Sequence, residues 1–241
     1  MEWIDEALVL AVRPHGETAA IGEFLTREHG RHVAFVHGGR SRRNRPVLQI
    51  GNHVEITWRA RLADQLGYAN VALRRGFAGE VMNDRLALAG LSSMAAMARI
   101  LPEREPQASL YEVALFVLGF MDDPEVWPAL YVRWELALLV ELGFGLELDA
   151  CAVTGVEVDL THVSPNSGRA VSRSAGEPYR DRLLVLPPFL RGGDRGPIAR
   201  PDVVAGLELT GHFLVHRILA PRDRDLPDVR LQLADLLARG Q

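Results

Sequence analysis

The chain has 241 residues, of which 48% are hydrophobic and 24% charged, and its formal net charge is −4. This balance is typical of a folded protein in water, with room for one large domain or two modest ones. The sequence holds no uncharged apolar stretch of the roughly 18 to 20 residues that cross a bilayer, and its acidic start differs from a basic signal peptide. A single cysteine, Cys151, excludes an internal disulfide framework, so we expect a cytoplasmic protein.

Positive charge is concentrated in one part of the sequence. All 27 basic side chains are arginine, which excludes lysine-dependent chemistry such as a phosphate-binding loop lysine. Residues 27–75 contain ten arginines and three acids, a local balance of +7, so the rest of the chain carries −11. A chain divided in this way can bind a polyanion with one part and stay dissolved through the other.

The first 80 residues have the pattern of short strands. Trp58 belongs to the clearest of these, in which apolar and polar residues alternate, and it shares the apolar face that we assign to the core. Five such segments with glycine-bearing connections favour a small barrel such as the OB-fold. The candidate strands are residues 7–12, 19–26, 32–36, 52–61 and 65–75.

Beyond residue 80 the pattern changes to that of helices. Residues 149–181 interrupt it, because they lose periodicity and are rich in turn-forming residues. We therefore predict an α+β protein, with a five-stranded OB-fold barrel at residues 1–80 and an α-helical domain at 81–241 that carries an irregular insertion at 149–181. The candidate helices are residues 83–102, 109–124, 125–148, 203–220 and 229–240.

The order of several motifs resembles the RecO family of bacterial DNA repair proteins. The opening EALVLAVRPHGETAAIGEFLTREHGRHVAFVHGGR contains an R-P-x-G-E turn at residues 13–17, an L-T segment that reaches Gly30, and then the glycine-bearing basic segment Gly38-Gly39-Arg40. The stretches CAVTG and VSPNSGRAVSRSAG follow later in the chain. The resemblance therefore covers nearly the whole sequence.

This resemblance implies a mediator of the RecF recombination pathway rather than an enzyme. It implies binding of single- and double-stranded DNA, annealing of complementary strands, and action with RecR, and often RecF, in loading RecA on DNA coated by single-strand-binding protein. It also implies a zinc-ribbon-like insertion, yet Cys151 is one thiolate where many relatives have four, and His162 does not complete the ligand set. We therefore expect a degenerate insertion that holds no metal, and no cofactor elsewhere.

The segment HGGRSRRNRP, residues 37–46, is the main candidate for binding a polyanion. Its arginines crowd together with no acidic residue among them, and a flexible loop of this kind can follow a nucleic-acid backbone. A loop that is kept polar for solubility is the alternative. The arginines of this segment are Arg40, Arg42, Arg43 and Arg45.

Five further arginines complete the predicted nucleic-acid-binding set: Arg13, Arg59, Arg61, Arg74 and Arg75. Arg59 and Arg61 share parity in their candidate strand and are expected on one face, opposite Trp58. Arg13 either reaches the same groove or caps the turn that follows it. Arg27 and Arg31 are expected at an exposed hairpin tip, and a base-stacking role for Phe35 and Tyr68 is left open.

Two other functions are considered. The fold alone does not fix the ligand, so an RNA-binding OB-fold protein is the first alternative. A hydrolase is the second, because Glu208, His212 and His216 recur every four residues and would share a helical face, although an ordinary half-exposed surface explains them more simply. His29, His32 and His37 are close in sequence, but positions 32 and 37 differ in strand parity, so their side chains diverge and we predict no metal site there.

Overall fold

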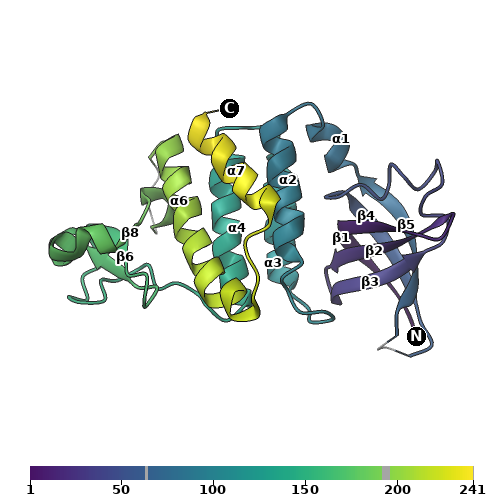
Figure 1. Ribbon diagram of the computed structural model, residues 1–241, viewed down its shortest axis with the longest axis horizontal. Coiled ribbons are helices and arrows are strands. Elements are labelled where there is room, and N and C mark those ends of the chain that lie inside the picture. Colours follow the sequence, from purple (N-terminus) through teal and green to yellow (C-terminus); the bar gives the residue numbers. More distant parts are fainter. Residues whose placement is uncertain (63–64, 192–195, 241) are drawn as a thin grey trace. The chain divides into compact units, whose positions relative to one another are not determined.

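The computed structural model of the protein describes residues 1–62, 65–191 and 196–240 (Figure 1). The chain divides into two compact units, Met1–Asp122 and Asp123–Gln241. Among the described residues, the first unit contains a β-barrel together with three helices, and the second contains the remaining helices and a small sheet. The boundary that we expected at residue 80 lies inside the first unit, because the helices that follow the barrel pack against it.

Five strands form a closed barrel in the order β1-β2-β3-β5-β4, and β1 pairs with β4 to close it. All pairs are antiparallel except β3 with β5. This arrangement is consistent with the predicted OB-fold, a five-stranded barrel. The strands are β1 (Glu2–His15), β2 (Ala19–Thr26), β3 (Gly30–Val36), β4 (His53–Arg59) and β5 (Gly67–Arg75).

Alternating side chains of the strands fill the barrel. The predicted core position of Trp58 is confirmed, since the residue is 1% exposed and lies among the buried residues of the barrel. Gly67 makes room for this ring, because a Cβ at that position would lie 2.2 Å from the indole. The prediction for Arg61 is wrong in one respect: β4 ends at Arg59, so Arg61 lies in the bend beyond it and strand parity does not relate the two.

The helices of the first unit are α1 (Phe77–Val81), α2 (Arg85–Ala98) and α3 (Ala108–Leu118). The Asp84 side chain caps α2 by accepting hydrogen bonds from the backbone of Leu86 and Ala87 at 2.9 and 3.0 Å, which satisfies donors that the helix leaves unpaired.

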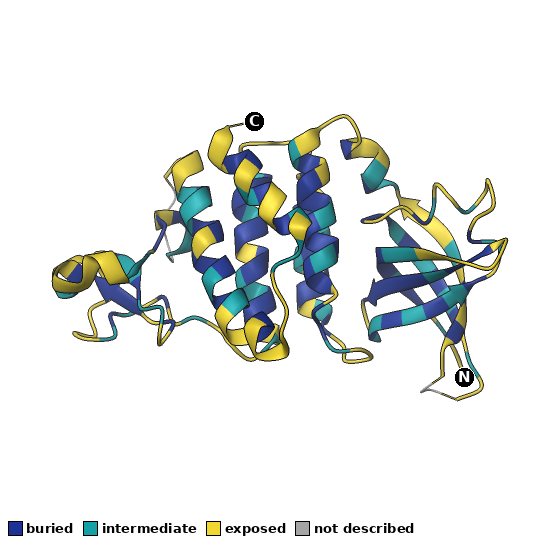
Figure 2. Cartoon of the chain, in the orientation of Figure 1, coloured by how far each residue is buried: buried dark blue, intermediate teal, exposed yellow. Residues whose placement is uncertain are grey.

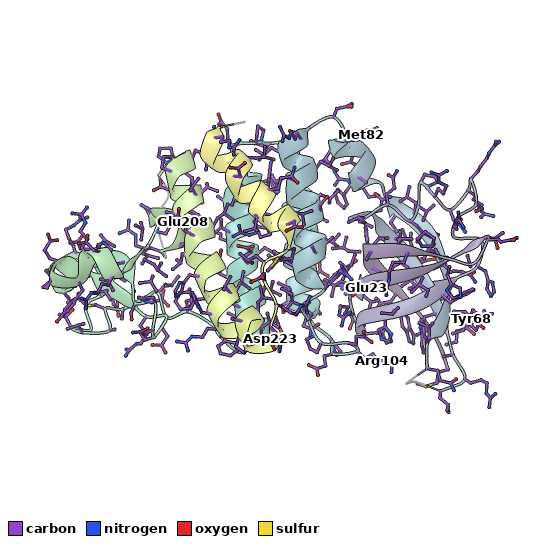
Figure 3. All side chains as sticks on the ribbon, viewed as in Figure 1. Glu23, Tyr68, Met82, Arg104, Glu208 and Asp223 are labelled. Atoms are coloured by element: carbon purple, nitrogen blue, oxygen red, sulfur yellow. The ribbon has the colours of Figure 1, made fainter. Side chains whose placement is uncertain are left out.

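Glu23 of β2 lies on the side of the barrel that faces these helices (Figure 3). It is 5% exposed and accepts hydrogen bonds from Arg31 at 2.5 Å and from Arg99 at 2.8 Å. Arg31 also pairs with Glu103 at 3.3 Å. The expectation that Arg31 lies at an exposed hairpin tip is therefore wrong, because its side chain joins the barrel to the segment after α2.

The second unit is built on α4 (Trp127–Glu141), α6 (Arg200–Phe213) and α7 (Asp228–Arg239). Its centre holds Glu135, which is fully buried and accepts hydrogen bonds from the side chains of Tyr131, Thr210 and Arg230. The run Arg200–Arg222 includes the π-helix η3 (Leu214–Leu219) and the turn η4 (Ala220–Arg222). By length and composition this run of 23 residues is apolar enough to cross a membrane, but 56% of its apolar stretch is buried inside the protein, as in a core helix.

The predicted irregular insertion folds around a small sheet of order β7-β6-β8. Cys151 lies beside it, 2% exposed, and its Sγ accepts a hydrogen bond from the backbone of Ser172 at 3.3 Å. Among the described residues, no three His, Cys, Asp or Glu side chains are grouped so as to hold a metal ion. The likeness to a zinc ribbon stays a prediction. The elements are β6 (Leu160–Val163), β7 (Ala170–Ser172), α5 (Arg173–Gly176), η1 (Glu177–Arg182), β8 (Leu184–Val185) and η2 (Pro188–Leu190).

Candidate nucleic-acid interface

The basic loop, residues 37–52, connects β3 to β4 as a series of hydrogen-bonded turns rather than as the flexible loop that we expected. The Asn44 side chain donates to the carbonyl of Gly38 at 3.1 Å, and the Asn52 side chain donates to the carbonyl of Pro46 at 2.8 Å. Leu48, 6% exposed, anchors the loop in the barrel core. The backbone that carries the arginines therefore has a defined shape.

This loop is also attached to the turn between β1 and β2. The backbone N–H of Arg40 donates to the carbonyl of Thr18 at 3.0 Å, and its guanidinium donates to the carbonyl of Gly16 at 2.9 Å. A Cβ at Gly39 would lie 2.7 Å from the Cβ of Ala20, so only glycine allows this approach. The loop and the turn are consequently joined into one surface.

Three arginines of the basic loop project from this surface without a compensating charge. Arg42, Arg43 and Arg45 are exposed, and none has a carboxylate within ion-pair distance in the part of the chain that the structure describes. Much of the loop is coloured as exposed in Figure 2. Arg40 is exposed as well and uses its guanidinium on a carbonyl group, which leaves its charge unpaired. The loop thus concentrates four positive charges that repel one another, and a bound anion would relieve that repulsion.

An open cavity of about 450 Å³ lies beneath these side chains. Arg40 and Arg45 line it together with apolar residues that include Val12, Ala20 and Leu48. Two arginines that line one cavity can offer several hydrogen-bond donors to a single phosphate, which is the contact that arginine makes best.

The other predicted arginines differ in their surroundings. Arg13 is exposed on β1 and Arg61 is exposed in the bend after β4, and no described carboxylate pairs with either. Arg59 pairs with Glu2 at 2.7 Å, and Arg74 pairs with Glu55.

Among the nine arginines of the predicted nucleic-acid-binding set, Arg75 has the most contacts that hold its side chain. Its guanidinium forms two hydrogen bonds with Glu80, at 3.0 and 2.8 Å, and lies 4.4 Å from the centre of the Phe77 ring. The hydrogen bond from Arg75 lowers the pKa of the Glu80 carboxyl below its usual value. Exposed pairs of this kind contribute only about 0–1 kcal/mol, so phosphate can replace the carboxylate, but until then the positive charge is cancelled. The structure therefore centres the candidate interface on the basic loop.

Four rings gather beside the basic loop, an arrangement that the sequence did not predict. His37 stacks on Tyr68 with ring centres 5.1 Å apart and planes 2° apart, and Phe35 contacts both at its edge. His15 contacts Phe35 at 5.3 Å. We call these four residues the aromatic cluster. The sequence carried only a weak signal, because residues 33–36 are apolar at both strand parities. In the structure, alternation along β3 places Phe35 opposite the buried Ala34 and Val36.

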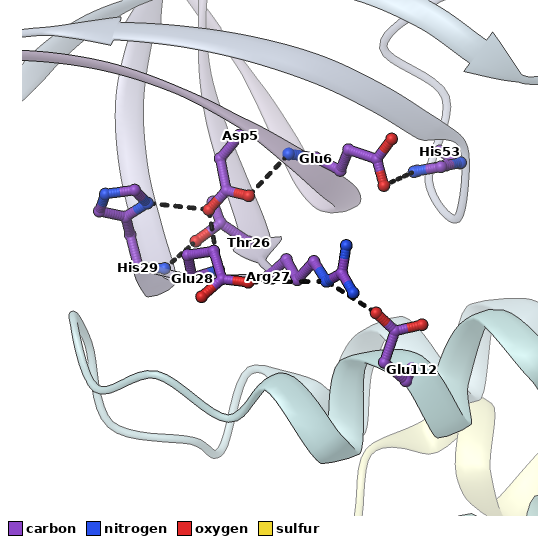
Figure 4. A network of polar contacts seen from close by, with 8 residues as sticks. All are labelled: Asp5, Glu6, Thr26, Arg27, Glu28, His29, His53 and Glu112. Carbon is purple, nitrogen blue, oxygen red and sulfur yellow. Dashed lines mark hydrogen bonds and ion pairs between the residues drawn. The ribbon is translucent and has the colours of Figure 1, made fainter.

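The histidines near the β2–β3 turn have structural roles instead (Figure 4). Asp5 accepts a hydrogen bond from the His29 ring at 2.8 Å and from the backbone of Glu6 and Glu28 at 2.8 and 2.9 Å. The His29 ring also stacks on Trp3 at 4.1 Å. His32 points into the barrel, where burial lowers its pKa to about 4. The His29 and His32 rings both contact Trp3. His37 lies apart from them, stacked on Tyr68, so the side chains of His32 and His37 diverge as their strand parities predicted.

The helical face of Glu208, His212 and His216 borders an open groove of about 470 Å³ on α6 and α7. The two histidine rings are 4.4 Å apart between their centres. Burial lowers the pKa of His212 below its usual value, which favours the neutral ring. With only two imidazoles in contact, this face offers a metal too few ligands for a stable site.

Comparisons with known proteins agree with the sequence resemblance. Residues 1–76 match the family model described as Recombination protein O N terminal, and residues 82–225 match Recombination protein O C terminal. The proteins named DNA repair protein RecO from Phenylobacterium zucineum and Caulobacter vibrioides are 52% and 50% identical over 241 residues, covering 100% of this chain and 99% of each relative. The protein of the same name from Methylorubrum extorquens is 51% identical over 242 residues, with 98% of both chains covered.

Proposed function

The chain belongs to the RecO family of DNA repair proteins, and from that premise we propose that its barrel binds DNA through the basic loop. Backbone phosphates would contact Arg40, Arg42, Arg43 and Arg45, and Arg13, Arg59 and Arg61 would extend the contact along the barrel. Arg74 and Arg75 stay in the proposed set, but they contribute only when DNA displaces Glu55 and Glu80. Single- and double-stranded DNA carry the same backbone phosphates, so this surface would bind both.

One observation carries the proposal. The protein has a net charge of −4, yet it holds Arg42, Arg43 and Arg45 on an ordered loop with no described carboxylate beside them. On a chain with more acids than bases, ion pairs are readily available, as those of Arg59 and Arg75 demonstrate. Three unpaired guanidinium groups on one loop repel one another, and a bound polyanion would remove that repulsion.

The wider role that we propose is that of a mediator rather than an enzyme. By neutralising phosphate charge the loop would let two complementary strands approach, which is what annealing needs. The proposal includes action in the cytoplasm with RecR, and possible participation of RecF, to place RecA on DNA coated by single-strand-binding protein. It assigns no cofactor, no metal and no membrane partner to the chain.

A charge-matched pair of variants tests the DNA-binding proposal. The four arginines of the basic loop are replaced by alanine in one variant, and exposed arginines of the second unit in the other: Arg180, Arg182, Arg222 and Arg224. Binding of a single-stranded oligonucleotide is measured over a range of salt. The loop variant is expected to bind weakly and to flatten the log–log salt slope by about 0.7 for each phosphate that it no longer neutralises. Equal effects of both variants would remove the loop from the mechanism.

Two further measurements address the wider role. Competition between single-stranded DNA and RNA of equal length separates DNA binding from the RNA-binding alternative, and tighter binding of RNA would favour that alternative. Annealing of strands precoated with the cognate single-strand-binding protein, with and without RecR, tests the mediator role. If the protein does not accelerate annealing in either condition, the mediator proposal fails while DNA binding can still stand.

A further inference from the structure

A row of outward-facing residues runs across all five strands of the barrel. Each member is the register partner of the next, and residues opposed in this way point to the same side of a sheet. The row presents two adjacent aromatic rings with an arginine at each end, over four strand spacings or about 19 Å. Its members are Arg13 of β1, Ile21 of β2, Phe35 of β3, Tyr68 of β5 and Arg59 of β4.

Tyr68 is the most accessible ring of this row. It is 55% exposed and lies on the side of the barrel away from α2 and α3 (Figure 3). Phe35 supports it from the neighbouring strand, with ring centres 5.4 Å apart and planes at 77°. Phe35 meets Tyr68 edge-on and His37 stacks on one face of the ring, so the other face is the one on which an aromatic group of a ligand can stack.

The row and the basic loop belong to one continuous surface. His37 is the first residue of the loop, and its ring stacks on Tyr68. His15 contacts Phe35 and directly precedes Gly16, whose carbonyl binds the Arg40 guanidinium. A strand whose phosphates lie along the loop arginines would therefore bring its next bases over the aromatic cluster.

We propose that Tyr68, supported by Phe35 and His37, is a stacking site for an unpaired base of single-stranded DNA, an inference that rests on the DNA-binding function proposed above. A base within a duplex has both faces covered by its neighbours, so it cannot stack on a ring outside the helix. An unpaired base can, because every base has a free aromatic face that such a ring accepts with little regard to sequence. The loop arginines bind either form of DNA, whereas Tyr68 adds affinity for the single strand alone.

The matched test uses three probes of equal length: oligothymidylate, an abasic strand with the same phosphates, and a duplex. Tyr68→Val keeps a residue that strands favour and removes the ring, and Tyr68→Phe keeps the ring. Tyr179→Val is the control, since Tyr179 is 59% exposed and lies in η1 of the second unit. Thermal unfolding of each variant verifies that the barrel is intact.

We expect Tyr68→Val to lose about five- to a hundredfold in affinity for oligothymidylate, the range that removal of one stacking ring produces. Its affinities for the abasic strand and the duplex, and its salt slope, should match those of the wild type, because its charge is unchanged. Tyr68→Phe and Tyr179→Val should bind like the wild type. Equal weakening on all three probes by Tyr68→Val would overturn the inference.

The wild type alone separates this inference from the proposal on which it rests. If it binds all three probes with one salt-dependent affinity, DNA binding through the arginines stands and the stacking site is refuted. If it binds none of them, both proposals fail. Tighter binding of oligothymidylate than of the abasic strand, abolished in Tyr68→Val, supports both.

Discussion

Glu135 and Arg230 form a bidentate ion pair that is buried between α4 and α7. The Nε atom of Arg230 lies 2.5 Å from Oε1 of Glu135 and an Nη atom lies 2.9 Å from Oε2, with side-chain exposures of 2% and 0%. Thr210 and the carbonyl of Leu207 complete the hydrogen bonding of the two groups. The second unit is thus centred on a charge pair that water does not reach.

We predict that Arg230→Met lowers the free energy of unfolding by about 3–5 kcal/mol, because it leaves the Glu135 carboxylate buried without its partner. Urea denaturation measures the loss. The double variant Glu135→Met/Arg230→Met removes both charges and should recover much of it. If the double variant is less stable than Arg230→Met, the carboxylate left without its partner is not the cause of the loss.

The backbone approach at Gly39 yields a prediction about the shape of the interface. Gly39→Ala places a methyl group 2.7 Å from the Cβ of Ala20, so the basic loop must shift away from the β1–β2 turn. We expect weaker DNA binding with all four arginines still present. Gly79→Ala is the control, because a Cβ there has no neighbour within 4 Å. Unchanged binding by Gly39→Ala would mean that the arginines act only through their number.

Release of a paired arginine should strengthen binding only where that arginine meets DNA. Glu2→Gln frees Arg59, which lies in the same row as Tyr68, and we expect tighter binding with a salt slope steeper by about 0.7. Asp235→Asn frees Arg239, which lies on α7 of the second unit outside the proposed set, and we expect little change. Titration of one labelled single strand over a range of salt compares the two variants. A larger gain from Asp235→Asn would mean that DNA contacts the second unit rather than the barrel.

His32 makes stability depend on pH. Burial, with a smaller contribution from the charge of Arg104, lowers its pKa from 6.5 to about 4. Between these values the unfolded chain binds more protons than the folded protein, so stability falls as the pH falls from 6.5 towards 4. The shift corresponds to a loss on the order of 3 kcal/mol.

The His32→Phe variant tests this link. Phenylalanine can keep the ring contacts with Trp3 and Trp58 but binds no proton. Denaturation at several pH values should show a shallower loss of stability for this variant than for the wild type. The dependence is not removed altogether, since burial also lowers the pKa of His53. If the free energy of unfolding falls equally steeply with pH in the variant and the wild type, His32 is not the group that causes the pH dependence.

The sequence predicted the elements well where the signal was local. The range of β2 was predicted residue for residue, and the alternation around Trp58 identified the core face of β4. It failed where the answer depends on strand register. Glu55 and Arg74 meet because β4 and β5 pair in one particular alignment, and Glu23 meets Arg99 from 76 positions away. The pattern of apolar and polar residues within one strand does not indicate which distant residue a side chain will meet.

The dependence on strand register also decided which parts of the candidate interface could be predicted. The basic loop was recognisable because its arginines are adjacent in the sequence, whereas Phe35 and Tyr68 become neighbours only through the parallel pairing of β3 with β5. The unpaired state of Arg42 and Arg43 could not be predicted either, since it depends on where every carboxylate of the folded unit lies.

Within the basic loop, the residues that hold its shape and those that carry its charge are different ones. Asn52 joins the loop to α1 by accepting a hydrogen bond from the backbone of Ala78 at 3.1 Å, and Asn44 and Leu48 fix the turns between. Arg42 and Arg43 take no part in this scaffold. Substitutions at these two positions can consequently change the affinity for DNA without destabilising the barrel. An insertion or deletion between Asn44 and Asn52 would instead change the spacing of the residues that hold the loop in shape.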